Sequence, residues 1–281
     1  MEIGIIGRGF VGEAVYQGLR EHYTIHTYDK YVGERSNCID LQDLCLKSEF
    51  LFVCLPTPMN RDGSCNTSIV ESTIREINQI TDGNHVVIIK STVPPGTTER
   101  LNAKYSNLNI VFNPEFLTEA NYIDDFKNQN RIIIGGTHPH STRVKKLKKK
   151  VFRDVPIIKT SSTIAEMVKY TANCFLATKV SFANEIKQLC DATCVDYDKV
   201  IEYATYDDRL GTSHWKVPGP DGHFGFGGSC FPKDVNGLIN YSKALDVKMN
   251  VLEATWQTNL TVRPEKDWEE LEGRAVTREG E

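Results

Sequence analysis

The 281-residue sequence lacks an apolar run of about eighteen residues, so nothing in it predicts a membrane-spanning helix. The apolar start, residues 1–6, is too short for a secretory signal and leads directly into a glycine motif. The formal net charge of −4 is also far from the excess of positive charge that binding to nucleic acid or an anionic membrane requires. We therefore expect neither nucleic acid nor a membrane among the partners.

The eight cysteines form no CxxC pair, and no histidine-rich segment accompanies them. Metal sites and disulfide frameworks usually show such spacings, so we expect neither a metal nor a disulfide scaffold. Unpaired cysteines fit a reducing compartment, which predicts a cytoplasmic protein.

The first motif present is a dinucleotide-binding fingerprint. A buried strand over 2–6 precedes a GxGxxG turn, a helix to about residue 21 and a second strand over 24–28 that ends at Asp29. The turn places a pyrophosphate on the helix N-terminus, and Asp29 binds the ribose hydroxyls. Asp29 would repel a 2′-phosphate, which favours NAD over NADP, although Lys30 weakens that preference. The residues predicted to bind the cofactor here are Gly7, Gly9, Phe10, Val11, Gly12, Asp29 and Lys30.

Strands and helices then alternate as far as residue 151. Strands are expected over 49–55, 85–90, 108–112 and 131–135, and helices over 67–80, 97–104, near 120 and over 139–151. This alternation predicts a doubly wound parallel sheet covered on both faces. Three polar, proline-containing segments follow strands, at 54–58, 90–97 and 113–119. Each alone is an ordinary turn, but all three fall at one edge of the sheet and indicate a shared site.

The most basic stretch, residues 143–150, has Val144, Leu147 and Val151 at helical spacing. It predicts an amphipathic surface helix with a solvated charged face rather than a nucleic-acid site.

The pattern changes at Ser162. Helical periodicity runs to about residue 195 without glycine or proline, and a helix of about thirty residues spans about 45 Å. Glu166, Lys169 and Asn173 share one face of it, either as a polar outer stripe or as part of a site. We expect three regions: a Rossmann domain over 1–161, a helical domain over 162–262 and a charged, loosely packed tail over 263–281.

Residues 224–234 crowd glycines, a cysteine, a lysine and an aspartate into eleven positions. Pro232 suits the first turn of a helix, which would place Cys230 just before its N-terminus. The helix dipole and Lys233 favour a thiolate, and Asp234 is near enough to accept or relay a proton. A structural cysteine in a glycine-rich turn is the alternative, but the crowding of reactive groups favours a catalytic thiol.

Taken together, these motifs resemble the UDP-glucose/GDP-mannose dehydrogenase family from Met1 to about Val262. The resemblance implies a Rossmann domain followed by an all-helical, 6-phosphogluconate-dehydrogenase-like dimerisation domain, and a homodimer built on the helix from Ser162. It also implies two-step, NAD-dependent oxidation of a nucleotide sugar at C6, with UDP-glucose as the expected substrate. Such enzymes usually carry a third, nucleotide-enclosing domain, and this chain ends about where that domain should begin.

The resemblance assigns roles to individual residues. Cys230 is the nucleophile that forms a thiohemiacetal and then a thioester, Lys169 and Asn173 stabilise the oxyanion, and Asp234 positions water. The further implied residues are Thr92 and Glu119 for proton handling, Thr57, Thr92 and Lys233 toward NAD, and Glu115, Phe116, Leu117, Lys169, Asn173, Arg209, Lys216 and Gly227 toward the substrate.

Two other functions stay open. A two-electron dehydrogenase of the hydroxyacid type would share the architecture but would not need the Cys230 loop. A truncated, non-catalytic relative that binds a nucleotide or a partner protein is the other, and the occupied catalytic positions argue against it.

Overall fold

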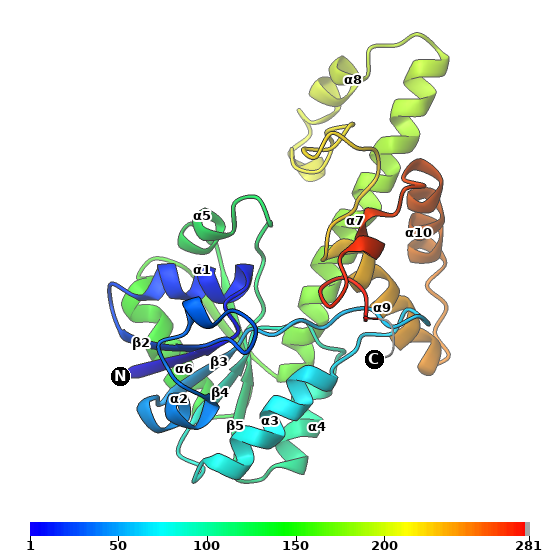
Figure 1. Ribbon diagram of the computed structural model, residues 1–281. Coiled ribbons are helices and arrows are strands. Elements are labelled where there is room, and N and C mark those ends of the chain that lie inside the picture. Colours follow the sequence, from blue (N-terminus) through cyan, green and yellow to red (C-terminus); the bar gives the residue numbers. More distant parts are fainter. Residues whose placement is uncertain (279–281) are drawn as a thin grey trace. The chain divides into compact units, whose positions relative to one another are not determined.

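The computed structural model of the chain describes residues 1–278 and divides them into two compact units (Figure 1). The first unit comprises Met1–Thr57 and Thr67–Lys169. The second comprises Pro58–Asn66 and the chain from Tyr170 onward. The boundary between Lys169 and Tyr170 falls inside one helix, α7 (Ser162–Ala192), whereas the boundary expected from the sequence lay just before this helix, between residues 161 and 162.

The first unit is built on a seven-stranded sheet with the order β2-β1-β3-β4-β5-β6-β7. The strands are β1 (Glu2–Ile6), β2 (Thr24–Tyr28), β3 (Phe50–Val53), β4 (Val86–Ile89), β5 (Asn109–Phe112), β6 (Ile132–Gly135) and β7 (Ile157–Thr160). The helices are α1 (Phe10–Leu19), η1 (Gly33–Arg35), α2 (Leu41–Lys47), α3 (Ser68–Ile80), α4 (Thr97–Lys104), α5 (Tyr122–Lys127) and α6 (His140–Val151).

The predicted α/β Rossmann-like sheet is confirmed, with one correction at its edge. Strands β2, β1, β3, β4 and β5 are parallel, whereas β6 runs antiparallel to β5 and β7 follows β6. For β6 to run parallel to β5, the connection would have to cross over and bring the chain back to the end of the sheet where β5 begins. The connection from β5 to β6 contains one short helix, α5, which packs against α1. The chain therefore enters β6 at the end of the sheet where β5 finished, and β6 runs in the opposite direction.

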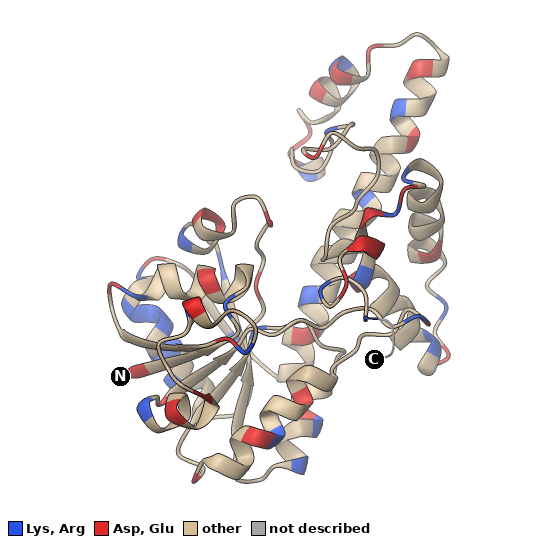
Figure 2. Cartoon of the chain, in the orientation of Figure 1, with Lys and Arg blue, Asp and Glu red and all other residues tan. Residues whose placement is uncertain are grey.

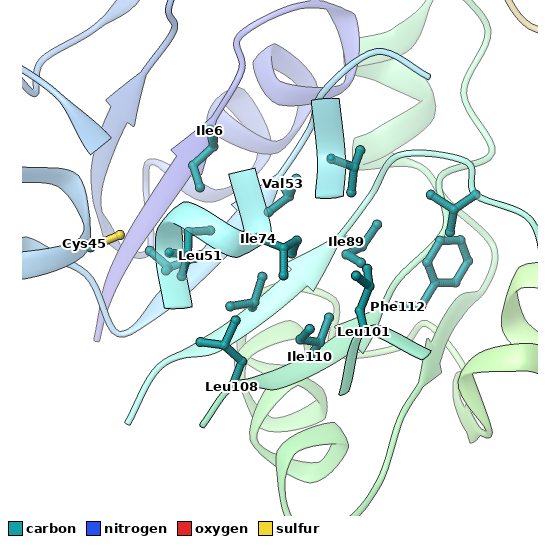
Figure 3. Packing of buried hydrophobic residues seen from close by; sticks show 14 of the residues in the cluster. Ile6, Cys45, Leu51, Val53, Ile74, Ile89, Leu101, Leu108, Ile110 and Phe112 are labelled. Carbon is teal, nitrogen blue, oxygen red and sulfur yellow. The ribbon is translucent and has the colours of Figure 1, made fainter. Parts of the chain in front are cut away.

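Both faces of the sheet are buried at its inner strands β1, β3, β4, β5 and β6, which are apolar at nearly every position, whereas β2 and β7 are partly exposed. Successive residues point to opposite faces: Leu51 and Val53 join one hydrophobic cluster, and Phe50 and Phe52 join the other. Figure 3 shows the first cluster, in which Ile74 of α3 packs over the strands. The sheet is therefore a rigid base for the turns that leave its carboxyl edge.

Helix α6 departs from the predicted solvated basic face at one residue. Figure 2 shows the charged residues on the cartoon of the chain. Most of the lysines of α6 are at least partly exposed, but Lys148 is fully buried. Its Nζ atom lies 4.9–5.9 Å from the ring centroids of Phe52, Phe126 and Phe152. Burial lowers the pKa of Lys148 well below its usual range. The sequence pattern could not show this, because the rings come from three separate segments.

In the described part of the second unit, the regular elements are helices. Besides the larger part of α7, they are α8 (Tyr197–Ala204), η2 (Asp208–Leu210), α9 (Phe231–Ala244), α10 (Asn250–Val262) and η3 (Asp267–Glu270). Across residues 1–278, no helix is both long and apolar enough to cross a membrane.

The prediction of a loosely packed tail after residue 262 is wrong for the residues that the structure describes. Trp268 and Arg263 are 1 % and 2 % exposed, and Trp268 packs on Trp256 with ring centroids 5.2 Å apart. Met59 donates its backbone N–H to the Ala275 carbonyl at 2.8 Å. The segment contains many charged residues and few apolar ones, so its composition did not indicate that side chains such as Trp268 would be buried. Residues 279–281 lie outside the described part of the chain.

Candidate functional site

The glycine turn between β1 and α1 is tight on one side and open on the other. Gly7 has a φ of +86°, and a Cβ atom on Gly12 would lie 1.9 Å from the Gly7 carbonyl oxygen. A Cβ atom on Gly9, by contrast, would meet nothing within 4 Å. The space beside Gly9, just before the N-terminus of α1, is therefore open, and a tight glycine turn at a helix N-terminus fits the pyrophosphate of NAD.

Asp29 lies at the end of β2, where the fingerprint requires an acidic residue. Its carboxylate accepts hydrogen bonds from the backbone N–H groups of Arg8 at 2.7 Å and Tyr31 at 2.9 Å. Asp29 therefore ties the glycine turn to the loop after β2. Of the other residues predicted to bind the cofactor, Phe10 and Lys30 are exposed to solvent and Val11 is half-buried in α1.

The three segments that follow β3, β4 and β5 do lie together. The Ser91 hydroxyl bridges the N–H and the carbonyl of Leu55, at 3.0 and 2.7 Å, and the Thr57 hydroxyl donates to the Thr92 carbonyl at 2.8 Å. Lys90 then joins the second segment to the third, because its Nζ donates to the Pro114 carbonyl at 3.1 Å. This confirms the argument that the carboxyl ends of the strands meet at one edge.

A buried ion pair occupies this edge. Lys169 Nζ lies 2.8 Å from Glu115 Oε1, and both side chains are buried. Burial opposes the charge on Glu115, but Lys169 outweighs it and the pKa of the carboxyl is lowered. Burial lowers the pKa of Lys90 to about 8. Lys90 received no role from sequence reasoning, since nothing in its local pattern distinguishes it from an exposed lysine after a strand.

The spacing of Glu166 and Lys169 left open whether their shared face of α7 is exposed or buried, and the structure shows that both side chains are buried. Glu166 is fully buried and accepts hydrogen bonds from the N–H groups of Gly96 at 2.6 Å and Thr98 at 2.8 Å. It therefore caps α4, whose first N–H groups would otherwise be unsatisfied. In the first unit, these polar residues of α7 face the interior and do not form an outer stripe.

A cavity of about 280 Å³ opens beside the Glu115 segment. Phe116 and Leu117 line it together with Lys90, Glu115 and Arg131. Glu119, at the end of the same segment, is half-buried. The loop after β5 thus presents both charged and apolar side chains at the carboxyl edge of the sheet.

In the second unit, Cys230 is the N-cap residue of α9 and Pro232 lies in its first turn. The Asp234 N–H donates to the Cys230 carbonyl at 3.0 Å, which closes that turn. The thiol therefore lies at the positive end of a helix, as the sequence predicted, and this environment favours a thiolate.

Asp234 is the centre of a buried polar cluster beside Cys230. It is 1 % exposed, pairs with Lys233 Nζ at 2.5 Å and accepts from Asn173 Nδ2 at 2.6 Å. Burial disfavours the charge on Lys233, but Asp234 and the thiols of Cys230 and Cys65 outweigh burial and raise its pKa. The lysine therefore stays charged next to the thiol.

Two further predicted residues lie on the loop before the cysteine stretch. Arg209 has a side chain 88 % exposed and pairs with Asp207 at 2.5 Å, and Lys216 is exposed. Lys179 of α7 donates to the carbonyls of Leu210 and Gly211, which tethers this loop to the helix. Both cations are thus presented to solvent on an anchored loop.

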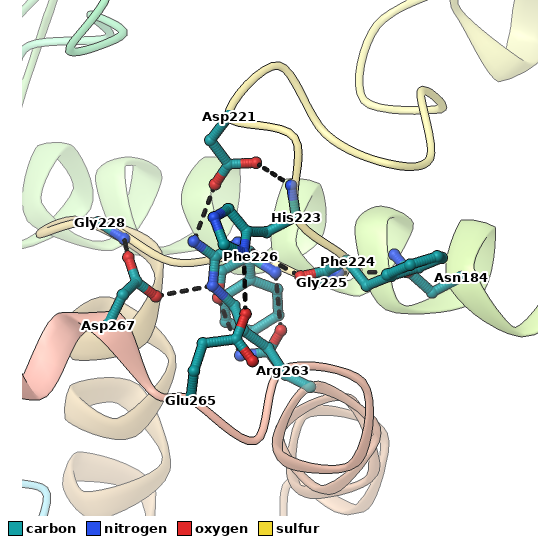
Figure 4. Close-up of polar contacts among 11 residues, drawn as sticks. Asn184, Asp221, His223, Phe224, Gly225, Phe226, Gly228, Arg263, Glu265 and Asp267 are labelled. Atoms are coloured by element: carbon teal, nitrogen blue, oxygen red, sulfur yellow. Dashed lines mark hydrogen bonds and ion pairs between the residues drawn. The ribbon is translucent and has the colours of Figure 1, made fainter.

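Sequence reasoning missed the side chains that hold the glycine stretch before Cys230. The side chains that contact it are those of Asn184, Asn259, Arg263 and Asp267. Figure 4 labels Asn184, Arg263 and Asp267 around this stretch. A possible signal was the spacing of Arg263 and Asp267, which suits an ion pair one turn apart, but it lies in a stretch whose composition suggested a tail.

Comparison with known proteins agrees with this geometry. The pattern of the UDP-glucose/GDP-mannose dehydrogenase family, NAD binding domain, matches residues 30–155, and that of the family's central domain matches residues 163–261. The chain belongs to the UDP-glucose/GDP-mannose dehydrogenase family. The fingerprint turn and the family match together identify NAD as the cofactor of the first domain.

Individual relatives are considerably longer. UDP-glucose 6-dehydrogenase TuaD of Bacillus subtilis is 34 % identical over 78 % of this chain and 48 % of its own length. GDP-mannose 6-dehydrogenase of Pseudomonas putida is 32 % identical over 81 % and 54 % respectively. The structure of a UDP-glucose dehydrogenase from Pyrobaculum islandicum superimposes with a TM-score of 0.84 at 29 % identity, covering 92 % of this chain and 68 % of that one. The chain therefore spans about half the length of the two curated relatives.

Proposed function

We propose that this chain carries out NAD-dependent, four-electron oxidation of a nucleotide sugar at C6, with Cys230 as the nucleophile. The observation that carries the proposal is the placement of Cys230 at the start of α9, beside the buried cluster of Lys233, Asp234 and Asn173. A charged lysine and a helix N-terminus both favour the thiolate that such a reaction needs.

In the proposed sequence, the C6 alcohol is first oxidised to an aldehyde, to which the Cys230 sulfur adds to give a thiohemiacetal. Loss of a second hydride gives a thioester, and water then releases the carboxylate and the thiol. NAD, when bound, supplies the hydride acceptor for both oxidations. Overall, one alcohol, two NAD⁺ and one water give one carboxylate, two NADH and three protons.

The remaining residues take roles in this scheme. Lys169 and Asn173 donate to the oxygen that becomes negative at C6, because amine and amide N–H groups stabilise an oxyanion. Asp234 orients the attacking water, and Thr92 and Glu119 assist proton transfer. Glu115, Phe116, Leu117, Arg209, Lys216 and Gly227 contact the sugar nucleotide, and Thr57 and Lys233 lie toward the nicotinamide half of NAD.

UDP-glucose is the proposed substrate. The TuaD and Pyrobaculum relatives carry that sugar nucleotide in their names, whereas the Pseudomonas putida relative acts on GDP-mannose. A panel containing both nucleotides therefore decides between them.

We also propose that the protein is a cytoplasmic homodimer, and the second unit offers an apolar surface for the dimer. Phe175, Phe182 and Leu189 recur every seven residues along α7 and are 67 %, 50 % and 60 % exposed. Seven-residue spacing places these three apolar side chains on one stripe of the helix, which a second copy of the chain would cover.

The test is NADH release on adding UDP-glucose or GDP-mannose, run with the natural chain and with Cys230→Ser. Two NADH per sugar, with acid formation abolished by the substitution, is the expected result. One NADH per sugar that survives the substitution would instead establish a two-electron dehydrogenase. Bound NAD without turnover on any nucleotide sugar would refute catalysis by this chain.

A further inference from the structure

The glycine stretch that leads to Cys230 is held by side chains rather than by a strand partner. Asn259 of α10 accepts from the Phe226 N–H at 2.7 Å and donates to the Phe226 carbonyl at 2.9 Å. Asn184 of α7 accepts from the Gly225 N–H at 3.1 Å. Two amide side chains thus satisfy the backbone groups of a buried irregular segment, as burial requires.

Arg263 extends this support past the end of α10. Its guanidinium is almost fully buried and donates to Asp267 Oδ1 at 2.6 Å, to Asp221 Oδ2 at 2.8 Å and to the Phe224 carbonyl at 3.2 Å. The other Asp267 oxygen accepts from the Gly228 N–H at 3.2 Å. Arg263 and Asp267 therefore connect both ends of the glycine stretch, and we call these two residues the clamp (Figure 4).

The clamp accounts for a glycine that the sequence motif contains. A Cβ atom on Gly227 would lie 2.3 Å from Asp267 Oδ1, 2.5 Å from Asp267 Oδ2 and 2.4 Å from Arg263 Nη2. Each of these atoms is held by a partner of its own: Asp267 Oδ1 by Arg263 Nε, Asp267 Oδ2 by the Gly228 N–H and Arg263 Nη2 by Asp221, so they have little freedom to move away. Gly227 is therefore a close-approach position for the protein's own side chains.

We propose that Arg263 and Asp267 are positioning residues that fix Cys230 for the reaction. The inference rests on the proposed role of Cys230 as the nucleophile. Gly228, which Asp267 holds, lies two residues before Cys230, and α9 begins one residue after it. Cys230 therefore lies between the N-terminus of α9 and the segment that the clamp holds. Loss of the clamp contacts should make the loop before Cys230 more mobile while α9 stays folded.

The first experiment measures backbone hydrogen exchange across residues 224–230 in the natural chain, in Asp267→Ala and in Asp267→Asn. Asp267→Ala removes the acceptor of Gly228 and the partner of Arg263, and we expect exchange there to rise by about tenfold or more. Asp267→Asn keeps an acceptor oxygen for Gly228 and should recover part of that protection. Lys187→Met, which breaks the exposed Lys187–Asp191 pair on α7, is the control and should leave the segment unchanged.

The second experiment combines Gly227→Ala with Asp267→Ala. If the clamp is what excludes a side chain at position 227, Gly227→Ala should speed exchange strongly in the natural chain and much less once Asp267 is truncated. Equal effects of Gly227→Ala in both backgrounds, or exchange in Asp267→Ala no faster than in Lys187→Met, would overturn the proposal.

The third measurement separates positioning from a purely structural role. We expect Asp267→Ala to lower kcat by about tenfold while leaving the KM for NAD unchanged, with partial recovery in Asp267→Asn. Faster exchange with an unaltered kcat would refute positioning. A natural chain that shows no turnover would refute the proposed function, and the exchange results, which need no substrate, would then decide alone whether the clamp orders the loop.

Discussion

Asn173 of α7 donates its side-chain amide to the carboxylate of Asp234 of α9, with 2.6 Å between Nδ2 and Oδ2. Both side chains are buried, so this bond ties α9, which begins just after Cys230, to the 31-residue helix α7. The contact joins residues 61 positions apart, and it gives Asn173 a structural role besides the proposed catalytic one.

Replacing Asn173 by Ala should therefore reduce stability as well as turnover. The substitution leaves one oxygen of a buried carboxylate without its donor, and such a loss costs about 1–3 kcal/mol. Urea denaturation followed by circular dichroism measures the change. Asn250→Ala, at an exposed position in the first turn of α10, is the matched control and should change the free energy of unfolding by less than about 0.5 kcal/mol.

Lys169→Met should destabilise the first unit at neutral pH by about 3–5 kcal/mol, because it leaves the buried carboxylate of Glu115 unpaired. In the natural chain the pKa of Glu115 is lowered, so its contribution to stability is present above its unfolded-state pKa and is lost as the pH falls through the folded-state value. Adding Glu115→Gln to the variant should restore most of the stability. A double variant no more stable than Lys169→Met would contradict this account.

Lys90 should make stability rise with pH in the alkaline range. Its pKa is lowered from 10.5 to about 8, chiefly by burial, so between these values the unfolded chain binds more protons than the folded one. The destabilising cost of charging Lys90 is complete below pH 8 and is relieved as the pH rises toward 10.5. Compared with Lys90→Met, the natural chain should gain at most about 1.4 kcal/mol per pH unit in this window. Parallel curves for the two proteins in urea titrations would refute the shift.

Substitutions of Gly9 and Gly12 in the fingerprint turn should differ in their effects on thermal stability and on NAD binding. Gly12→Ala forces a Cβ atom to 1.9 Å from the Gly7 carbonyl oxygen, so we expect a lower melting temperature as well as loss of NAD binding. Gly9→Ala meets only open space within the protein and should leave the melting temperature unchanged while weakening NAD binding, because the ligand's pyrophosphate approaches there. Calorimetric titration with NAD and thermal unfolding of each variant provide the two readouts.

The segment after α10 should contribute substantially to stability. Trp268→Ala removes a fully buried indole that packs on Trp256, and losses of this kind cost about 3–5 kcal/mol. Glu270→Ala, on the exposed side of the same short helix, is the control. Equal melting temperatures for the two variants would show that the segment does not support the second unit.

Some features of this protein follow from local sequence alone. The glycine turn after β1, the unbroken periodicity of α7 and the start of α9 just after Cys230 were all predicted, because each depends on residues close together in the chain. Backbone permissiveness, helical period and helix-start preference act over a few residues, so a sequence pattern is enough to place them.

Other features needed the tertiary structure. That Lys148 lies against the rings of Phe52 and Phe126, that Glu166 caps α4 and that Arg263 clamps the cysteine loop depends on partners tens of residues away. A charged residue looks the same in sequence whether it is solvated or buried, since its state is decided by what packs against it. The composition of the C-terminal segment therefore led to a wrong prediction of a loosely packed tail. Its long-range contacts show instead that this segment supports the glycine stretch before Cys230.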